Sequence, residues 1–349
     1  MGLTYVSPDD PGIERRRVGR GFSYRDAAGA RVADAATLRR IRALVIPPAW
    51  RAVWICADPN GHLQAVGQDQ KGRRQYRYHE AFREHREGAK FEHMIAFAEA
   101  LPRLRDRVRR DMESPGLGRR KVLATVVHLL ETTMIRVGNA AYAKDNKSYG
   151  LTTLNSRHVT INGGDLRFHF KGKSGNVWRL SLHDRRVARI VRSCQELPGQ
   201  HLFQYADEAG VRQAITSADV NAYLREMSGA DITAKDFRTW TGTVLAATAL
   251  AELGVAAEAR GARKNVSKAI AQVAAHLGNT PTICRKSYVH PEILAAYLQG
   301  DGIARMGTRI EGPFGGGERL RPEEAAVLAF LKAKRRASGP PRSLQAAAA

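Results

Sequence analysis

The chain has 349 residues, 43% of them hydrophobic and 26% charged, so we expect a globular protein with two domains or one large one. It has no run of eighteen apolar residues and its first ten residues do not resemble a secretory leader, so we expect neither a membrane-spanning helix nor secretion. Its three cysteines, Cys56, Cys194 and Cys284, are odd in number and widely spaced, which favours reduced thiols over disulfides or a zinc site. These features predict a soluble cytoplasmic protein.

The charge is strongly positive, with 56 Lys and Arg against 34 Asp and Glu and a net charge of +22. The excess is spread along the chain, at +7 over 1–90, +11 over 91–312 and +4 over 313–349. Positive charge in both halves favours a polyanion gripped from two sides, and nucleic acid is the obvious candidate. The alternative is a generally basic, solvated surface. A membrane surface is less favoured, because no basic amphipathic helix with an aromatic face stands out.

Residues 1–89 are expected to form a small β-rich domain, with short apolar runs separated by turn signals. Asn60-Gly61 between two such runs predicts a hairpin, and residues 36–44 predict one short helix. The charged stretch 82–93, centred on Gly88, is the predicted linker.

Helical periodicity dominates the predicted second domain, residues 90–312. We expect a helix over 91–112 interrupted near Pro102, and another from about 123 that ends at Gly138. Residues 158–182 switch to strand periodicity and predict a three-strand meander with an exposed, Gly-rich turn at 171–176. Further helices are expected from the capping box Thr233/Asp236 to Gly254, over 266–278, and from Pro281 and Pro291 onward.

The tail, residues 313–349, is basic and Ala-rich, and we expect one last helix near 322–335 followed by disorder. The predicted fold class is α+β. A small N-terminal antiparallel β-sheet domain precedes a larger, mainly α-helical domain with an embedded three-strand sheet.

Several familiar cofactor motifs are absent from the sequence. There is no GxxxxGK[ST], GxGxxG or HExxH, so neither ATP, a dinucleotide nor a catalytic zinc is expected.

What remains is a scattered set of polar residues at structurally marked points: Arg136, Lys173, Arg238, Asn279 and Tyr288. Four of them have a plain structural explanation: a cation at a helix C-terminus, a solvated turn lysine, a helix cap and a half-buried tyrosine. Arg238 is different, because a cation near a helix N-terminus is unfavourable unless an anion binds there as well.

The order and local context of these residues resemble a known family. The segments MIRVGNAAYAKDNKSYGLTTL, FHFKGKSG, KDFRTWTGT and LGNTPTICRKSYVHPEI, in that order, resemble the type IB DNA topoisomerases, specifically the small bacterial and poxvirus-like forms. The upstream segment DQKGRRQYRYH is similar to their N-terminal DNA-contacting strand. The resemblance covers roughly residues 15–300 and implies a fold shared with the tyrosine recombinases.

The resemblance also implies roles for the five residues. Tyr288 would attack a DNA phosphodiester and become joined to the 3′-phosphate, while Arg136 and Arg238 would hold the nonbridging oxygens. Lys173 would protonate the leaving 5′-oxygen. Asn279 stands where the family usually has His, so only a hydrogen bond to a nonbridging oxygen is carried over. Two guanidiniums suit the charge of phosphoryl transfer, so no metal is expected. The covalent phosphotyrosine would store the bond energy, so no ATP is expected.

The same resemblance supplies candidate DNA contacts: Arg73, Arg74, Gln75, Tyr76, Tyr78, Tyr142 and Lys235. Two family lysines near Tyr142 are replaced here by Asn139 and Ala141. The expected partner is double-stranded DNA, held by a monomeric clamp in the bacterial nucleoid.

Two alternatives remain open at this point. A tyrosine recombinase or integrase shares the catalytic fold, but usually has His at the position of Lys235, His or Trp at that of Asn279, and a helical N-terminal domain. A noncatalytic DNA-binding protein would explain the charge but leave the catalytic set without a purpose.

Overall fold

The computed structural model describes residues 2–300 and 319–338. Its described residues fall into two compact units, 2–92 and 93–300 with 319–338. The predicted disorder of 339–349, and the part of the predicted tail at 313–318, lie outside the described residues.

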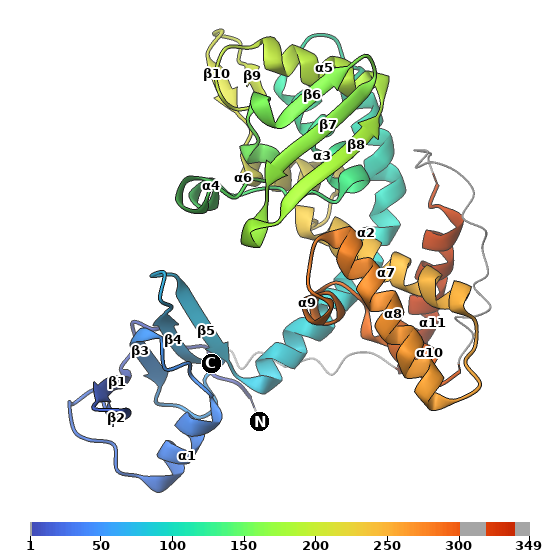
Figure 1. The fold of residues 1–349 in the computed structure, drawn as a ribbon. Coiled ribbons are helices and arrows are strands. Elements are labelled where there is room, and N and C mark those ends of the chain that lie inside the picture. Colours follow the sequence, from blue (N-terminus) through green and yellow to red (C-terminus); the bar gives the residue numbers. More distant parts are fainter. Residues whose placement is uncertain (1, 301–318, 339–349) are drawn as a thin grey trace. The chain divides into compact units, whose positions relative to one another are not determined.

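The first unit is a five-stranded antiparallel sheet with one helix, drawn in blue in Figure 1. Its strands lie in the order β2-β1-β3-β4-β5 and the helix α1 spans Ala35–Ala43. The strands are β1 (Gly12–Val18), β2 (Gly21–Arg25), β3 (Arg51–Cys56), β4 (Leu63–Gln68) and β5 (Arg74–Tyr78). The predicted hairpin around Asn60-Gly61 is confirmed, because β3 and β4 pair antiparallel with Ile55 opposite Ala65. A core cluster joins the sheet to α1 through Ile41.

Helix α2 (Glu80–Glu113) corrects two predictions. The predicted linker 82–93 is helical throughout, and Pro102 does not interrupt the helix. A proline removes one backbone donor, but Leu101 and Leu104 on either side of it are both about 1% exposed. Burial of the apolar side chains on this face of α2 outweighs the cost of the hydrogen bond that Pro102 cannot make. The boundary between the two units falls inside this helix, between residues 92 and 93.

The second unit contains the predicted meander, drawn in green in Figure 1. Strands β6 (Val159–Asn162), β7 (Asp165–Lys171) and β8 (Val177–His183) pair antiparallel in that order. Leu166, Phe168 and Phe170 are buried on one face, as their alternation predicts, and α5 (Arg185–Glu196) packs against β7. The α+β class is therefore confirmed.

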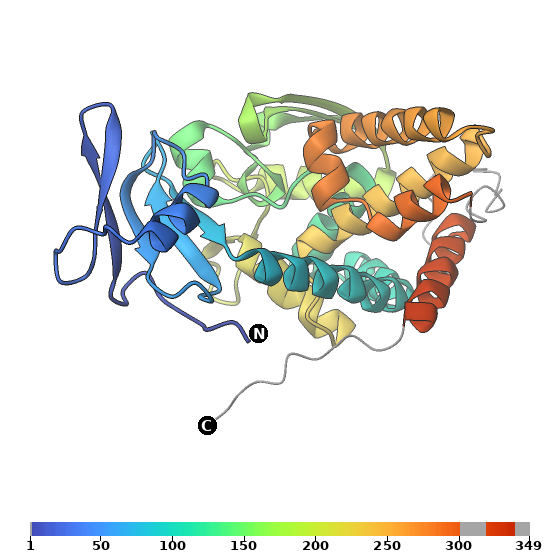
Figure 2. The same ribbon diagram turned by 90° about the horizontal axis from the view of Figure 1, so that it is seen from below.

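Helices make up most of this unit. The remaining ones are α3 (Arg119–Thr133), α4 (Ala140–Asn146), α6 (Ser217–Ser228), α7 (Ala234–Leu253), α8 (Ala259–Leu277), α9 (Pro281–Ser287), α10 (Pro291–Leu298) and α11 (Pro322–Ser338). A two-stranded ribbon of β9 (Gln204–Ala206) and β10 (Arg212–Ala214) completes the unit. The capping box at Thr233/Asp236 and the N-caps at Thr280 and His290 form as predicted. Helix α7 packs against α3, α8, α10 and α11, so it lies at the centre of the helical layer (Figure 2).

Helix α11 is anchored by a buried ion-pair network. Arg105 of α2 donates to both carboxylate oxygens of Glu324, at 2.9 and 2.7 Å, and also contacts Glu131 of α3. Trp240 of α7 completes the set, with its indole nitrogen 3.4 Å from Glu324. The last helix is thereby tied to three others.

None of the helices in the described ranges has the length and hydropathy needed to cross a membrane. Cys56, Cys194 and Cys284 are buried free thiols.

Candidate active site

Arg136 lies just beyond α3 rather than at the end of that helix. The prediction that the helix continues to Gly138 is wrong, because Met134 adopts a left-handed φ of 56° and ends the helix at Thr133. Arg136 is half-buried in the extended segment that follows. It is therefore directed by tertiary contacts and not by the helix.

A short turn, η1 (Leu151–Thr153), holds the backbone of that segment. The amide of Leu151 donates to the Arg136 carbonyl at 2.9 Å, and the amide of Thr152 donates to the Val137 carbonyl at 2.7 Å. A Cβ at Gly150 would lie 2.5 Å from the Arg136 carbonyl oxygen, so this approach requires glycine.

Arg238 is a buried cation in the second turn of α7. Its side chain is turned inward and the residue is only 4% exposed. One terminal nitrogen donates to the Met134 carbonyl at the end of α3, and the other donates to the Leu277 carbonyl at the end of α8, at 2.5 Å. A single guanidinium thus joins three helices, while its Nε is buried without a hydrogen-bond partner.

Tyr288 follows α9, where it forms the C-cap. The Cζ atom of Arg238 lies 5.2 Å from the centre of the Tyr288 ring. Helix α7 approaches the tyrosine backbone closely, because a Cβ at Gly242 would lie 2.6 Å from the Tyr288 carbonyl oxygen. The tyrosine is half-buried beside the guanidinium of Arg238.

Asn279 follows Gly278, the left-handed C-cap of α8 with a φ of 59°. Its Oδ1 accepts a hydrogen bond of 2.5 Å from Arg136, which links the ends of α8 and α3. Its Nδ2 is buried and has no hydrogen-bond partner. Buried donors are normally satisfied, so this amide has an unused hydrogen bond beside a cation.

Lys173 lies at the tip of the β7–β8 hairpin, in the short turn η3 (Lys173–Gly175). The residue is exposed, as predicted for this turn. Its charge nevertheless reaches Tyr288, because it is one of the cations that lower the pKa of that phenol.

The charges in the site act on one another. Burial raises the pKa of Tyr288, but the nearby cations Arg238, Arg136 and Lys173, together with a hydrogen bond from Arg238, outweigh it and leave that pKa below its ordinary value. Burial, with the charge of Arg136, lowers the pKa of Arg238 to about 10. Three cations thus act electrostatically on one phenol, an arrangement that favours a bound anion.

The candidate DNA contacts lie in both units. Arg74, Gln75, Tyr76 and Tyr78 are on β5, which is a strand as predicted, and Arg73 directly precedes it. The rings of Tyr76 and Tyr78 are 6.0 Å apart and nearly parallel. Arg73 pairs with Asp69, which also accepts a hydrogen bond from Gln75.

Tyr142 and Lys235 are exposed in the second unit, on α4 and in the first turn of α7. Asn139 caps α4, where its side chain accepts a hydrogen bond of 3.2 Å from the Tyr142 amide. It therefore has a structural role as the N-cap of α4.

Three groups that hold the site together were not predicted from the sequence. The carbonyls of Met134 and Leu277 accept hydrogen bonds from Arg238, and Gly150 allows a close approach to the Arg136 carbonyl. Backbone carbonyls have no sequence signature. Gly150 lies in the segment MIRVGNAAYAKDNKSYGLTTL, whose resemblance to the family is described above, but the sequence does not reveal that it contacts Arg136.

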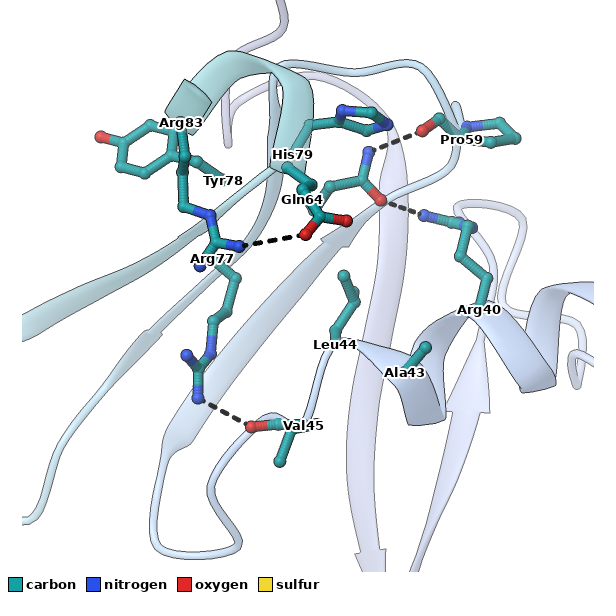
Figure 3. Close-up of a pocket in the computed structure, with 11 residues that line it drawn as sticks. Arg40, Ala43, Leu44, Val45, Pro59, Gln64, Arg77, Tyr78, His79 and Arg83 are labelled. Atoms are coloured by element: carbon teal, nitrogen blue, oxygen red, sulfur yellow. Dashed lines mark hydrogen bonds and ion pairs between the residues drawn. The ribbon is translucent and has the colours of Figure 1, made fainter. Parts of the chain in front are cut away.

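A basic cavity of 520 Å³ lies in the first unit, between α1, β5 and the start of α2 (Figure 3). Its arginines are bonded within the fold: Arg40 donates to Gln64 at 2.7 Å, and Arg77 donates to the Val45 carbonyl at 2.8 Å. The first bond joins α1 to β4, and the second joins β5 to the segment that follows α1. Of the candidate DNA contacts, Tyr78 is in its lining.

Within the described ranges, no three His, Cys, Asp or Glu side chains gather in a way that could hold a metal ion.

The chain is similar to known proteins over most of its length. Residues 79–304 match the family described as eukaryotic DNA topoisomerase I, catalytic core, and residues 21–69 match the bacterial DNA topoisomerase IB N-terminal domain. DNA topoisomerase 1B of Acanthamoeba polyphaga mimivirus is 33% identical over 293 residues, which cover 82% of this chain and 87% of the viral protein. DNA topoisomerase 1 of Rabbit fibroma virus is 26% identical, over 68% of this chain and 72% of that protein. DNA topoisomerase 1B of Vaccinia virus (strain Copenhagen) is 25% identical, over 66% and 70%.

Proposed function

The chain belongs to the type IB DNA topoisomerase family, and from this premise we propose that it relaxes supercoiled duplex DNA through a 3′-phosphotyrosyl intermediate at Tyr288. Membership in a family of topoisomerases sets aside the recombinase and the noncatalytic binder. The roles of individual residues are our proposal.

The observation that carries the proposal is the convergence of cations on one tyrosine. The Cζ atom of Arg238 lies 5.2 Å from the centre of the Tyr288 ring. Burial raises the pKa of that phenol, but Arg238, Arg136 and Lys173 outweigh it and lower the pKa, so the phenolate forms more readily than that of an ordinary tyrosine. The phenolate oxygen is the nucleophile in such a reaction. The same cations would stabilise the negative charge that develops on the phosphate oxygens.

In the proposed cleavage step the Tyr288 phenol loses its proton to solvent, and its oxygen forms a bond to the scissile phosphorus. The bond from phosphorus to the 5′-oxygen breaks, and Lys173 gives that oxygen its proton. Arg136 and Arg238 hold the two nonbridging oxygens, and the buried Nδ2 of Asn279 donates to one of them. Religation is the reverse reaction and releases the tyrosine.

The covalent bond to tyrosine retains the energy of the broken phosphodiester, so we expect relaxation to need no ATP. We also expect it to need no metal ion, because guanidinium groups provide the charge stabilisation. Between the two steps the free 5′ end rotates and supercoils are lost. We propose that a monomer binds duplex DNA through both units, since both carry excess positive charge, and that it acts at the bacterial nucleoid.

The test is relaxation of supercoiled plasmid in EDTA without ATP, with denaturation by SDS to trap the adduct. We expect wild type to relax the plasmid and to become attached to a 3′ end, and Tyr288→Phe to do neither. Tyr205→Phe, a tyrosine of the same unit in β9, is the matched control and should behave as wild type. Wild-type protein that neither relaxes DNA nor forms an adduct at any salt concentration would refute the proposal.

A further inference from the structure

Trp178 occupies the space between two segments that each lead into a residue of the candidate site. It lies on β8 in register with Phe170, and the two rings are nearly parallel, with centroids 6.2 Å apart and 5° between their planes. Phe170 is only 4% exposed, so it is a firm support for one face of the indole.

The first segment is the start of the hairpin turn. A Cβ at Gly172 would lie 2.8 Å from both Cδ1 and Nε1 of Trp178. Nonbonded contacts of a Cβ atom are essentially never this short. Gly172 has a φ of −96°, a value open to every residue. Glycine is therefore required there for space and not for its backbone freedom. The next residue is Lys173.

The second segment is the end of α8. A Cβ at Gly278 would lie 2.9 Å from Cζ2 of Trp178, on the six-membered side of the same indole. The next residue is Asn279, which accepts the hydrogen bond from Arg136. One edge of the indole thus packs against Gly172, the residue before Lys173, and the other edge packs against Gly278, the residue before Asn279.

Among the described residues, two hydrogen bonds from the segment 148–149 also hold the start of this turn. The Lys171 carbonyl accepts from the Tyr149 amide at 2.8 Å, and the Gly172 carbonyl accepts from the Ser148 hydroxyl at 3.1 Å. Both bonds lie before the tip, and Lys173 itself is exposed. A lysine on a long side chain reaches a 5′-oxygen only if its backbone is held at the right separation from the groups that hold the phosphate.

We propose that Trp178 is a positioning residue for the general acid: its indole is the spacer that sets the β7–β8 hairpin, and hence Lys173, at a fixed distance from Asn279 and Arg136. This inference rests on the proposed function, in which Lys173 protonates the leaving oxygen. It adds to that function a residue whose effect should be confined to proton transfer.

The test uses a chemical difference between leaving groups. A duplex with a cleavage site mapped for this enzyme is made in two forms, with oxygen or with sulfur bridging phosphorus and the 5′ carbon. A thiolate leaves without being protonated, so cleavage of the sulfur form does not depend on a general acid. The single-turnover rate is measured on both forms for wild type, Trp178→Ala, Lys173→Ala and Val177→Ala.

We expect Trp178→Ala to cleave the oxygen form about 10- to 100-fold more slowly than wild type, since small misplacements of a catalytic group cost rates of this order. On the sulfur form it should fall within about threefold of wild type, in the pattern of Lys173→Ala, because the proton is no longer needed. Val177→Ala is the matched control: this neighbour on the same strand is 59% exposed and should match wild type on both forms.

Gly172→Ala is an independent test that leaves the tryptophan in place. The added methyl would displace the indole or the hairpin, so we expect the same slow cleavage of the oxygen form with recovery on sulfur. In the Trp178→Ala background the methyl meets no indole, and adding Gly172→Ala should cause no further slowing.

Equal slowing of Trp178→Ala on both forms would overturn the inference, because the indole would then support the whole site. So would a rate for Trp178→Ala on the oxygen form within twofold of wild type. The proposed function fails in a different way: wild type then forms no adduct with either duplex. Failure of sulfur to restore Lys173→Ala would remove the general acid, and the inference with it.

Discussion

Asn279 offers a sharp test of the proposed site, because the two polar atoms of its side chain have different surroundings. Its Oδ1 accepts from Arg136 at 2.5 Å, and its Nδ2 is buried without a partner. One side chain therefore has two separable functions, to orient Arg136 and to donate to the phosphate. Asn279→Ala removes both functions. Asn279→Asp keeps an acceptor for Arg136 but replaces the donor by a negative charge.

The magnitudes follow from the two hydrogen bonds. A hydrogen bond to a charged group contributes about 1.5–3 kcal/mol, so loss of the Arg136 contact alone corresponds to about 10- to 150-fold in rate. Loss of a donor to an oxygen that gains charge in the transition state typically costs about 10²–10³. Asn279→Ala removes both, so we expect it to slow cleavage by at least about 10²–10³, and by up to about 10⁵ if the two losses add fully in free energy. Asn279→Asp should be slower still, because its carboxylate would repel the phosphate.

The assay is single-turnover formation of the SDS-resistant adduct, with thermal unfolding of each variant as the control for folding. Arg136→Ala and the double variant with Asn279→Ala complete a mutant cycle. If Asn279 only orients Arg136, the double variant will be no slower than Arg136→Ala. An Asn279→Asp enzyme faster than Asn279→Ala would refute the donor role, and rates within threefold of wild type for both would refute any role.

Four further predictions concern stability, the pH dependence of cleavage, the guanidinium of Arg238, and salt. Glu324→Gln breaks the buried pair with Arg105 and should lower the free energy of unfolding by about 3–5 kcal/mol; a loss below about 1 kcal/mol in denaturant titration contradicts this. Burial raises the pKa of Glu324, but hydrogen bonds and charge from Arg105 lower it overall. The Glu324 carboxylate therefore contributes its full stabilisation above the pKa of the unfolded chain, near 4.5, and this stabilisation is lost as pH falls through the lower pKa of the folded protein. Wild type should show this loss of stability at low pH, and Glu324→Gln should not. The pKa of Tyr288 lies below its ordinary value of 10, so the cleavage rate should rise with pH and level off below pH 10. Arg238→Lys should cleave more slowly than wild type, because lysine lacks the planar guanidinium that donates to two carbonyls at once. Finally, DNA affinity should fall steeply with salt, and Arg73→Ala should reduce the slope of log K against log salt by about 1 if that residue contacts phosphate; an unchanged slope removes it from the contacts.

Local signals in the sequence determined many of the elements correctly. The capping box at Thr233/Asp236 marks the start of α7, and Asn60-Gly61 marks the connection of β3 to β4. Alternation of Leu166, Phe168 and Phe170 marks the buried face of β7. These signals work because a cap, a turn or a strand face depends on residues a few positions apart.

The errors arose where distant contacts outweighed local preference. Residues 82–93 contain Gly88 and many charges, and a proline such as Pro102 usually interrupts a helix. Helix α2 nevertheless continues through residues 82–93 and through Pro102. Around Pro102 the helix has a buried stripe that begins at Met94, in which the Phe97 ring lies 5.1 Å from that of Phe237 of α7, and this packing stabilises what the proline disfavours. Helix α3 ends early for a similar reason, since turn η1 holds the following segment in extended form.

For the candidate site, the sequence alone pointed to Arg136, Lys173, Arg238, Asn279 and Tyr288 through their motifs. Only the tertiary structure decided that Arg238 is buried against the ends of α3 and α8, and that Asn279 has a free buried donor. Nor does any local pattern connect Trp178 with Gly172 and Gly278, since the second glycine is a hundred residues away. Local periodicity specifies elements, whereas the separation between catalytic groups is set by side chains that fill the space where those elements meet.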